Sequence, residues 1–229
     1  MAVVGSNLTS GSDTDSGTTA TTASVSPTSN NLILLGIVNT DSGAAPTISG
    51  LGLTWVQIDS STFNVTSQDR RINLFRALGT VTPGTVTITF GSDTQDIRWS
   101  MGQFSGIDTG GTNGSGAIVQ SAKNVSETAA TNWTVTLGAF SNVDNGAYGC
   151  FGASGSDGAT VGSGFTLLST AGGDPDNTNL TSEWRADNDT SVDYSQTNSH
   201  RMGGIAVEIK AAAAAANTQR YLTMMGIGS

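Results

Sequence analysis

Short stretches in which apolar and polar residues alternate recur along most of the chain. The clearest is 85–90, where Val86, Ile88 and Phe90 share one face and three threonines share the other. A period of two residues places successive side chains on opposite faces of a β-strand. This stretch therefore predicts a strand with one buried face and one polar face.

Other stretches predict further strands. Residues 32–38 are apolar except for Gly36, which predicts a strand buried on both faces. Clusters of Gly, Asn, Asp and Ser separate the strands and predict turns. About ten short strands at this spacing predict an all-β fold, an antiparallel jelly-roll-like β-sandwich. The remaining expected strands are 18–25 (at a sheet edge), 54–58, 73–76, 97–104, 133–137, 147–151, 165–168, 180–185 and 205–209.

We expect one β-sandwich domain over residues 1–210, because no internal repeat and no convincing linker interrupts them. The polar residues 1–30 form either an N-terminal arm or an edge strand. Residues 211–229 differ in character. They begin with six alanines, which predict a linker with at most one or two helical turns.

Beyond the alanines, large apolar side chains concentrate in the last residues of this sequence. A solvated tail is more usually polar, so these side chains predict a docking tail. They can fold back onto their own sandwich or insert into another subunit, and we favour insertion. The expected partner-binding residues are Arg220, Tyr221, Leu222, Met224, Met225 and Ile227.

Composition narrows the classes of protein. The 229 residues include 28 Ser, 33 Thr and 30 Gly, and only 12% of residues are charged. Thr favours strands, and Gly and Ser favour turns, so a helical bundle or coiled coil is excluded. The net charge of −9 repels phosphate and anionic lipid, so neither nucleic acid nor a membrane is an expected partner.

The N-terminal residues contain no basic region followed by an apolar run, so we expect no signal peptide and synthesis in a host cytoplasm. No apolar run is long enough to span a bilayer. The single cysteine, Cys150, cannot form an internal disulfide and is expected to be a small buried residue.

Candidate catalytic groups are few, and we expect no enzymatic activity. The only histidine, His200, is expected at the surface or in a turn, and no nucleophile motif accompanies it. Glu183 and Glu208 lie on different expected strands that can approach each other, but the glutamates form no local acid pair on one strand. A polysaccharide-active enzyme with two carboxylates is therefore the least favoured alternative. Structural salt bridges of these glutamates with Arg185 or Arg201 are favoured instead.

A weak calcium site is also possible. Asp187, Asp189 and Asp193 occupy alternate positions, as hard oxygen ligands do in the first half of a calcium loop. The match is partial, because Val192 stands where the turn glycine belongs and no glutamate closes the loop. A solvated acidic loop is favoured, and no other cofactor is expected.

Four tryptophans are candidate platforms for sugar rings. Trp99 and Trp133 lie within alternating stretches, which favours the core, whereas Trp55 is expected near a rim. Tryptophans in a sandwich are more often core residues than platforms. A carbohydrate-binding module that uses Trp55 or the loop 187–193 is therefore the second interpretation, and the resemblance described next would place it on a tail fibre or baseplate.

Several stretches, taken together and in order, resemble a β-sandwich family of tailed-phage virion structural proteins and related bacterial proteins of unassigned role. The resemblance covers most of residues 15–210. The residues after the alanines also resemble the short ends of small phage virion proteins, with the usual run of arginines reduced to Arg220. The stretches that carry the resemblance are 31–35, 52–55, 70–77, 84–90, 99–109, 163–166, 183–185 and 203–209.

This resemblance implies a non-enzymatic virion component, a capsid decoration or head-fibre protein on the virion surface. Its implied partners are other virion proteins, such as the major capsid protein, and further copies of itself. A glycan of the host surface is an additional possible partner. The family provides no catalytic residues to assign to positions of this chain.

Overall fold

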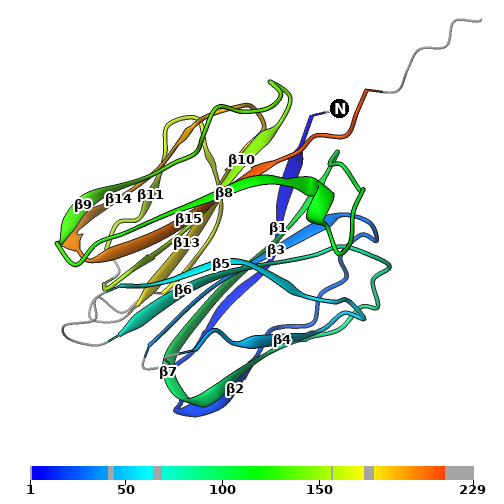
Figure 1. The fold of residues 1–229 in the computed structure, drawn as a ribbon. Coiled ribbons are helices and arrows are strands. Elements are labelled where there is room, and N and C mark those ends of the chain that lie inside the picture. Colours follow the sequence, from blue (N-terminus) through cyan, green and yellow to red (C-terminus); the bar gives the residue numbers. More distant parts are fainter. Residues whose placement is uncertain (1, 41–43, 64–68, 156, 173–177, 215–229) are drawn as a thin grey trace, which may run out of the picture.

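The structure is a computed structural model that describes residues 2–40, 44–63, 69–155, 157–172 and 178–214. Within this part, antiparallel strands form sheets of seven, five and three strands, and the first of these folds over through β7, so that the sheets stack as four layers, each of which we call a sheet below (Figure 1). Two inner sheets face each other, and a small outer sheet covers each of them. The predicted all-β antiparallel sandwich is confirmed, and the described residues include no α-helix.

Inner sheet 1 has the strand order β1-β7-β3-β6-β5, and outer sheet 1 consists of β2 and β4 on either side of the first part of β7. The strands are β1 (Val4–Asp13), β2 (Gly17–Thr21), β3 (Leu32–Thr40), β4 (Thr47–Gly50), β5 (Val56–Phe63), β6 (Arg70–Ala77) and β7 (Val86–Ser105).

Inner sheet 2 has the order β12-β13-β10-β15-β8, and outer sheet 2 has the order β11-β14-β9. A 3-10 turn, η1 (Ser115–Ala117), precedes β8. The strands are β8 (Ile118–Val125), β9 (Ala130–Thr136), β10 (Gly146–Ala153), β11 (Thr160–Val161), β12 (Thr166–Ala171), β13 (Asn179–Arg185), β14 (Ser191–His200) and β15 (Met202–Ile209).

The four layers explain why some strands are apolar throughout and others alternate. All nine residues of β3 are buried, because β3 contacts inner sheet 2 on one face and outer sheet 1 on the other. β10 and β15 are buried along their whole length for the same reason. The strand predicted to be buried on both faces is therefore confirmed.

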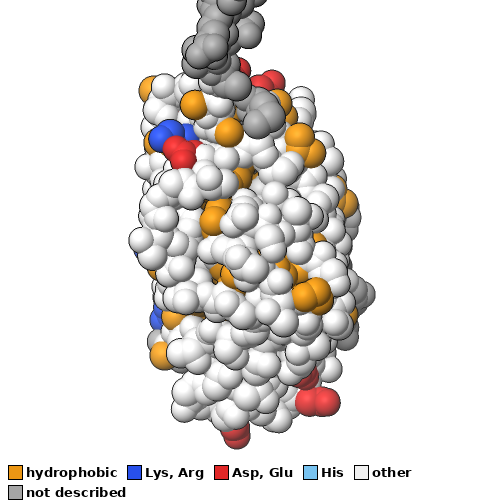
Figure 2. Space-filling view, turned by 90° about the vertical axis from the view of Figure 1, so that its right-hand side faces the viewer, with side chains coloured by type: hydrophobic (Ala, Val, Ile, Leu, Met, Phe, Trp, Pro, Cys, Tyr) orange, Lys and Arg blue, Asp and Glu red, His pale blue; other side chains and the backbone are white. Residues whose placement is uncertain are grey.

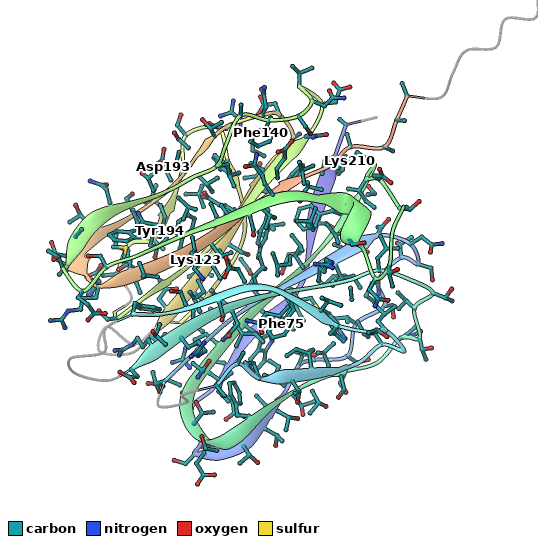
Figure 3. The ribbon with its side chains drawn as sticks, in the orientation of Figure 1. Phe75, Lys123, Phe140, Asp193, Tyr194 and Lys210 are labelled. Carbon is teal, nitrogen blue, oxygen red and sulfur yellow. The ribbon has the colours of Figure 1, made fainter. Side chains whose placement is uncertain are left out.

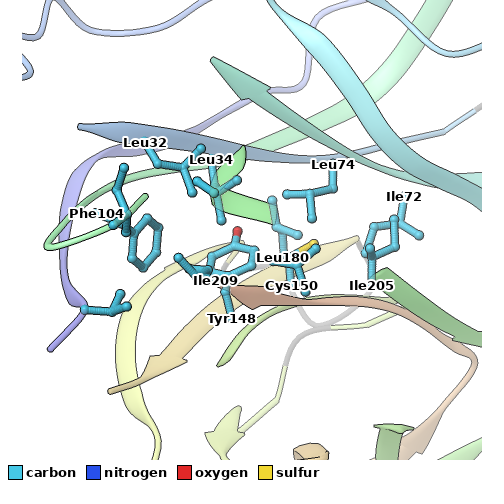
Figure 4. Close-up of a cluster of buried hydrophobic side chains, with 14 of the residues drawn as sticks. Leu32, Leu34, Ile72, Leu74, Phe104, Tyr148, Cys150, Leu180, Ile205 and Ile209 are labelled. Atoms are coloured by element: carbon cyan, nitrogen blue, oxygen red, sulfur yellow. The ribbon is translucent and has the colours of Figure 1, made fainter. Parts of the chain in front are cut away.

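The central cluster of the core lies between the two inner sheets (Figure 4). Leu34, Leu74 and Phe104 from inner sheet 1 pack against Tyr148 and Ile205 from inner sheet 2. Cys150 is fully buried in the same cluster, as expected. This interface joins the two halves of the chain, since inner sheet 1 comes from residues before 106 and inner sheet 2 from residues after 117.

Two sequence expectations need correction here. The stretches 85–90 and 97–104 belong to one strand, β7, which leaves outer sheet 1 and continues in inner sheet 1. Asp96, at this transition, has a left-handed φ of 48°, a conformation that Asp tolerates better than most residues. Residues 4–13 and 191–200, for which no strand was predicted, form β1 and β14.

The N-terminal residues belong to the sandwich in this chain. β1 and β2 both pair with β7, and β2 lies at the edge of outer sheet 1, as expected for 18–25. The described part of the N-terminal segment is therefore made of edge strands.

Candidate functional site

The predicted partner-binding residues Arg220, Tyr221, Leu222, Met224, Met225 and Ile227 lie outside the described residues. The structure does describe the base from which this segment starts, residues 210–214, which we call the tail base. Ala211 forms a β-bridge with Ile107, and the Ala212 N–H donates to the Gly106 carbonyl at 2.8 Å. Ala211 is a bridge residue and residues 212–214 are not helical, so the helical turns predicted for the alanines do not occur in this part of the chain.

A buried carboxylate organises the surroundings of the tail base. Glu208 in β15 has no exposed surface and accepts hydrogen bonds from four groups. Asn145 Nδ2 and Gln120 Nε2 each donate at 2.6 Å, and the Ser141 N–H and Oγ donate at 2.9 and 3.0 Å. Asn145 Oδ1 in turn accepts the Ala211 N–H at 2.9 Å, so this network holds the tail base to the sandwich.

The network also determines the charge of Glu208. Burial acts to raise the pKa of this carboxyl, but the hydrogen bonds from Asn145, Gln120 and Ser141 outweigh burial and leave the pKa below its usual value. Glu208 is therefore ionised at neutral pH. A charge that is stabilised in this way fixes the loop 141–145 against β15.

A cavity of about 460 Å³ lies beside the tail base. Lys210 Nζ is 2.7 Å from Asp108 Oδ2 at its edge, and this hydrogen bond is the main cause that holds the pKa of Asp108 below its usual value. The cavity walls carry charged, amide and hydroxyl groups together with the alanines. Its lining residues are Asp108, Ser141, Asn142, Asp144, Asn145, Lys210 and Ala211–Ala214.

On the face shown in Figure 2, apolar side chains are scattered, and most of the surface consists of backbone and uncharged polar side chains. Few large apolar residues are exposed in the described part of the chain. Three of them flank the tail base. Val4 pairs with Ser105 next to Gly106, Val119 follows the start of β8, and Val143 lies in the loop that holds Asn145. The large apolar residues exposed in the described part are Val4, Val119, Val125, Val143 and Leu167.

The residues of the possible calcium site do not converge. Arg185 forms ion pairs with Asp187 and, at 2.8 Å, with Asp189, whereas Asp193 accepts a hydrogen bond from the Thr134 hydroxyl. The hydrogen bond from Arg185 is the main cause that lowers the pKa of Asp187. No three His, Cys, Asp or Glu side chains of the described residues gather as a metal ion requires, so the structure gives the calcium site no support.

The two glutamates of the enzyme alternative lie on the same face of inner sheet 2. Ala147 pairs with Glu208 on one side and Arg185 on the other, and Glu183 lies two residues before Arg185. Both side chains have no exposed surface, so they do not face each other across an open cleft. Among the described residues, neither glutamate forms an ion pair, so the predicted salt bridges with Arg185 or Arg201 are wrong.

The tryptophans are mostly occupied by packing. Trp99 is buried, and Trp55, Trp133 and Trp184 are half-buried and pack against core clusters. The indole N–H of Trp55 donates to the Gly50 carbonyl at 3.3 Å. His200, expected at the surface or in a turn, is half-buried at the end of β14, with Nε2 3.2 Å from Asp157 Oδ2.

Comparisons with known proteins add no assignment: no family model, no curated protein and no solved structure matches this chain. The resemblance to phage virion proteins therefore stays a prediction. No helix in the described part of the chain has the length and apolar character needed to cross a membrane.

Sequence reasoning missed the network around the tail base. Glu208 was considered only as a catalytic or salt-bridging group, and Asn145 was one of many turn residues. The network joins residues that are 63 to 88 positions apart, so no local motif identifies it.

Proposed function

We propose that this chain is a non-enzymatic structural protein of a tailed-phage virion. It acts as a capsid decoration or head-fibre protein that is held to the particle by residues 215–229. The observation that carries this proposal is the tail base, where buried hydrogen bonds fasten the last described residues to one end of the sandwich. A fastened base transmits force from a docked tail to the sandwich.

The surface of the sandwich supports docking on another protein. The tail sequence contains five large apolar side chains, but the cavity next to the tail base is lined by charged, amide and hydroxyl groups and, among apolar residues, only by alanines. Val4, Val119 and Val143 are exposed apolar residues in segments next to those that bond to the tail base. A partner that receives the tail can also cover these side chains.

Apolar burial by the tail, repeated over many copies, supports attachment to a particle. Burial of a large apolar side chain contributes about 1.5–3 kcal/mol before the cost of ordering the tail. Individually weak contacts add up when many copies bind one symmetric lattice. The sandwich itself needs no catalytic group for this role.

The test is co-sedimentation with capsids assembled from the major capsid protein of the same genome. The full chain is compared with a truncation after Ala214, which keeps the hydrogen bonds of Ala211 and Ala212. A full-length variant in which Tyr221, Leu222, Met224, Met225 and Ile227 are all changed to Ser serves as the matched control for chain length.

We expect the full chain to co-sediment and both altered chains to stay in the supernatant. Equal co-sedimentation of all three chains would show that the tail is not the anchor. Light scattering on the same three chains then reports whether the tail also mediates self-association. No co-sedimentation of the full chain would count against the capsid role.

The two alternative functions have less support. The tryptophans proposed as sugar platforms pack against the core, which weakens a carbohydrate-binding module built on Trp55. A polysaccharide-active enzyme needs accessible carboxylates, whereas Glu183 and Glu208 are buried.

A further inference from the structure

A polar groove lies on outer sheet 2, away from the tail base. It is a cavity of about 300 Å³ formed by β9, β14 and the turn that follows β11. Asp193 pairs directly with Thr134 and Ser195 with Asn132, so two cross-strand pairs place four polar side chains in a compact block. The cavities at the groove and at the tail base share no lining residue.

The alternation of these strands turns the block toward solvent. Val192, Tyr194 and Val135 are buried in the core cluster between inner and outer sheet 2. Asp193 and Thr134, their immediate neighbours, therefore occupy the opposite face, and Figure 3 shows Asp193 above Tyr194 at this sheet. The groove thus opens outward on a well-packed base.

The groove lining has hydrogen-bond acceptors and hydroxyl groups that no other described residue uses. The Asp193 carboxylate accepts one hydrogen bond, from Thr134, and forms no ion pair with another described residue. An ionised carboxylate has about four acceptor positions, so most remain available. The hydroxyls of Ser163 and Ser195 form no hydrogen bond with the rest of the described chain.

The groove contains no lysine or arginine among its lining residues. An anionic ligand would meet the Asp193 carboxylate in a chain of net charge −9, so anions are disfavoured. Trp133 and Val161 pair with the buried Tyr194, so their side chains lie on the opposite face and pack against the core cluster. One carboxylate, one amide and several hydroxyls on the open face suit a neutral ligand that is rich in hydroxyl groups.

A buried carboxyl under the groove wall is an independent observation. Glu183 has no exposed surface, and its Oε2 accepts the Gly162 N–H at 2.9 Å, whereas its Oε1 has no partner among the described residues. An unpaired buried oxygen costs stability. A functional site nearby is one explanation for such a group, and Gly162 is itself a lining residue of the groove.

We propose that this groove binds a neutral carbohydrate. Asp193 and Asn132 hydrogen-bond to sugar hydroxyls. The site goes beyond the anchoring role and does not depend on it, because the groove is complete without residues 215–229. A sugar-binding groove would give an anchored exterior protein contact with a surface glycan.

The test is an NMR titration of the full chain, with backbone amides as reporters. The probes are glucose, galactose, mannose and N-acetylglucosamine as neutral sugars, and glucuronate as the anionic comparison. We expect one or more neutral sugars to shift amides of 132–134, 161–163 and 193–195. Glucuronate should bind more weakly than glucose.

Two variants locate the site. Asp193→Ala should weaken binding about tenfold or more, as loss of a charged hydrogen-bond partner does. Asn132→Ala, at an exposed position, should weaken it less. Asp93→Ala makes the same charge change at an exposed position outside the groove and should leave the affinity unchanged.

Unchanged amides outside the groove would show that each variant is folded. The proposal is overturned if no neutral sugar shifts the groove amides, if the shifts map elsewhere, or if glucuronate binds best. It is also overturned if Asp93→Ala weakens binding as much as Asp193→Ala.

Discussion

Glu208 and Glu183 are both fully buried on the same face of inner sheet 2, with β10 between them, but their surroundings differ. Glu208 accepts four hydrogen bonds from Asn145, Gln120 and Ser141. Glu183 accepts one, from the Gly162 N–H. The same residue type in the same layer is therefore satisfied at the tail base and under-satisfied beneath the groove.

Their pKa values diverge accordingly. Hydrogen bonds keep the pKa of Glu208 below its usual value in spite of burial. Burial raises the pKa of Glu183 from 4.5 to about 8, and nearby Asp193 adds a smaller effect in the same direction. Glu208 is ionised at neutral pH, and Glu183 is protonated. We infer that one region of the sheet is built for fastening and the other tolerates a cost to stability.

The largest expected effect comes from breaking the satisfied site. Glu208→Ala removes the acceptor of four donors, and the partly enclosed groups of Asn145 and Gln120 lose their partner. We expect a loss of about 3–5 kcal/mol in the free energy of unfolding, measured by urea denaturation at pH 7.

Glu127→Ala is the matched control, because Glu127 is exposed. Its effect should stay within about 0.5 kcal/mol. A Glu208→Ala chain as stable as this control would contradict the view that the network fastens the tail base.

For Glu183→Gln we expect an increase in the free energy of unfolding, the opposite of the effect of Glu208→Ala. The native state holds the Glu183 proton more tightly than the unfolded state, so the wild-type chain loses stability as pH rises from about 4.5 to about 8. Glutamine has no proton to lose. The variant should therefore be more stable than the wild type by roughly 3 kcal/mol at pH 7, with little difference near pH 4.

Urea denaturation across this pH range measures the difference. Glu208 contributes with the opposite sign, because its lowered pKa gives stability that is lost as pH falls through its folded-state pKa. If the stability of the Glu183→Gln chain depended on pH as that of the wild type does, the inferred difference in pKa between Glu183 and Glu208 would be contradicted.

The fold was largely predictable from local patterns. The first part of β7 was identified because burial of one face makes apolar and polar residues alternate. β3 was identified because burial of both faces makes the strand apolar throughout. β14 was missed because its inward side chains include Gln196 and its outward ones are polar, so the alternation is weak. The continuity of β7 through Asp96 depends on a backbone bend that no pattern of hydrophobicity encodes.

The sites were less predictable for a different reason. The spacing of Asp187, Asp189 and Asp193 suggested a loop, but a strand begins at Ser191 and turns Asp193 away from the other two. The partners of Glu208 and Glu183 are brought together by sheet pairing and layer stacking. Such contacts depend on the complete fold, whereas the residue types alone left several alternatives open.

A smaller effect on stability is expected at Gly162, the residue of the groove wall that bonds to Glu183. A Cβ added at Gly162 would lie 2.9 Å from the Asp193 carbonyl oxygen and 3.1 Å from the Phe165 ring, so β11 must move away from β14. Gly162→Ala should cost about 1–3 kcal/mol and shift the amides of the groove. Gly17→Ala, where an added Cβ meets no atom within 4 Å, is the control. Equal stability of both variants would show that the wall is not tightly packed.

The smallest effect is expected at the exposed edge of the tail base. Lys210 and Asp108 form an ion pair at 2.7 Å, but their side chains are 49% and 29% exposed, so water and salt screen it. Lys210→Ala should lower the free energy of unfolding by less than about 1 kcal/mol, and the difference should shrink further at high salt. Denaturation at low and high salt measures this, with Lys123→Ala as the control, since Lys123 forms a comparable exposed pair with Asp59 at 2.8 Å. A loss as large as that of Glu208→Ala would mean that the exposed pair, and not the buried carboxylate, holds the tail base.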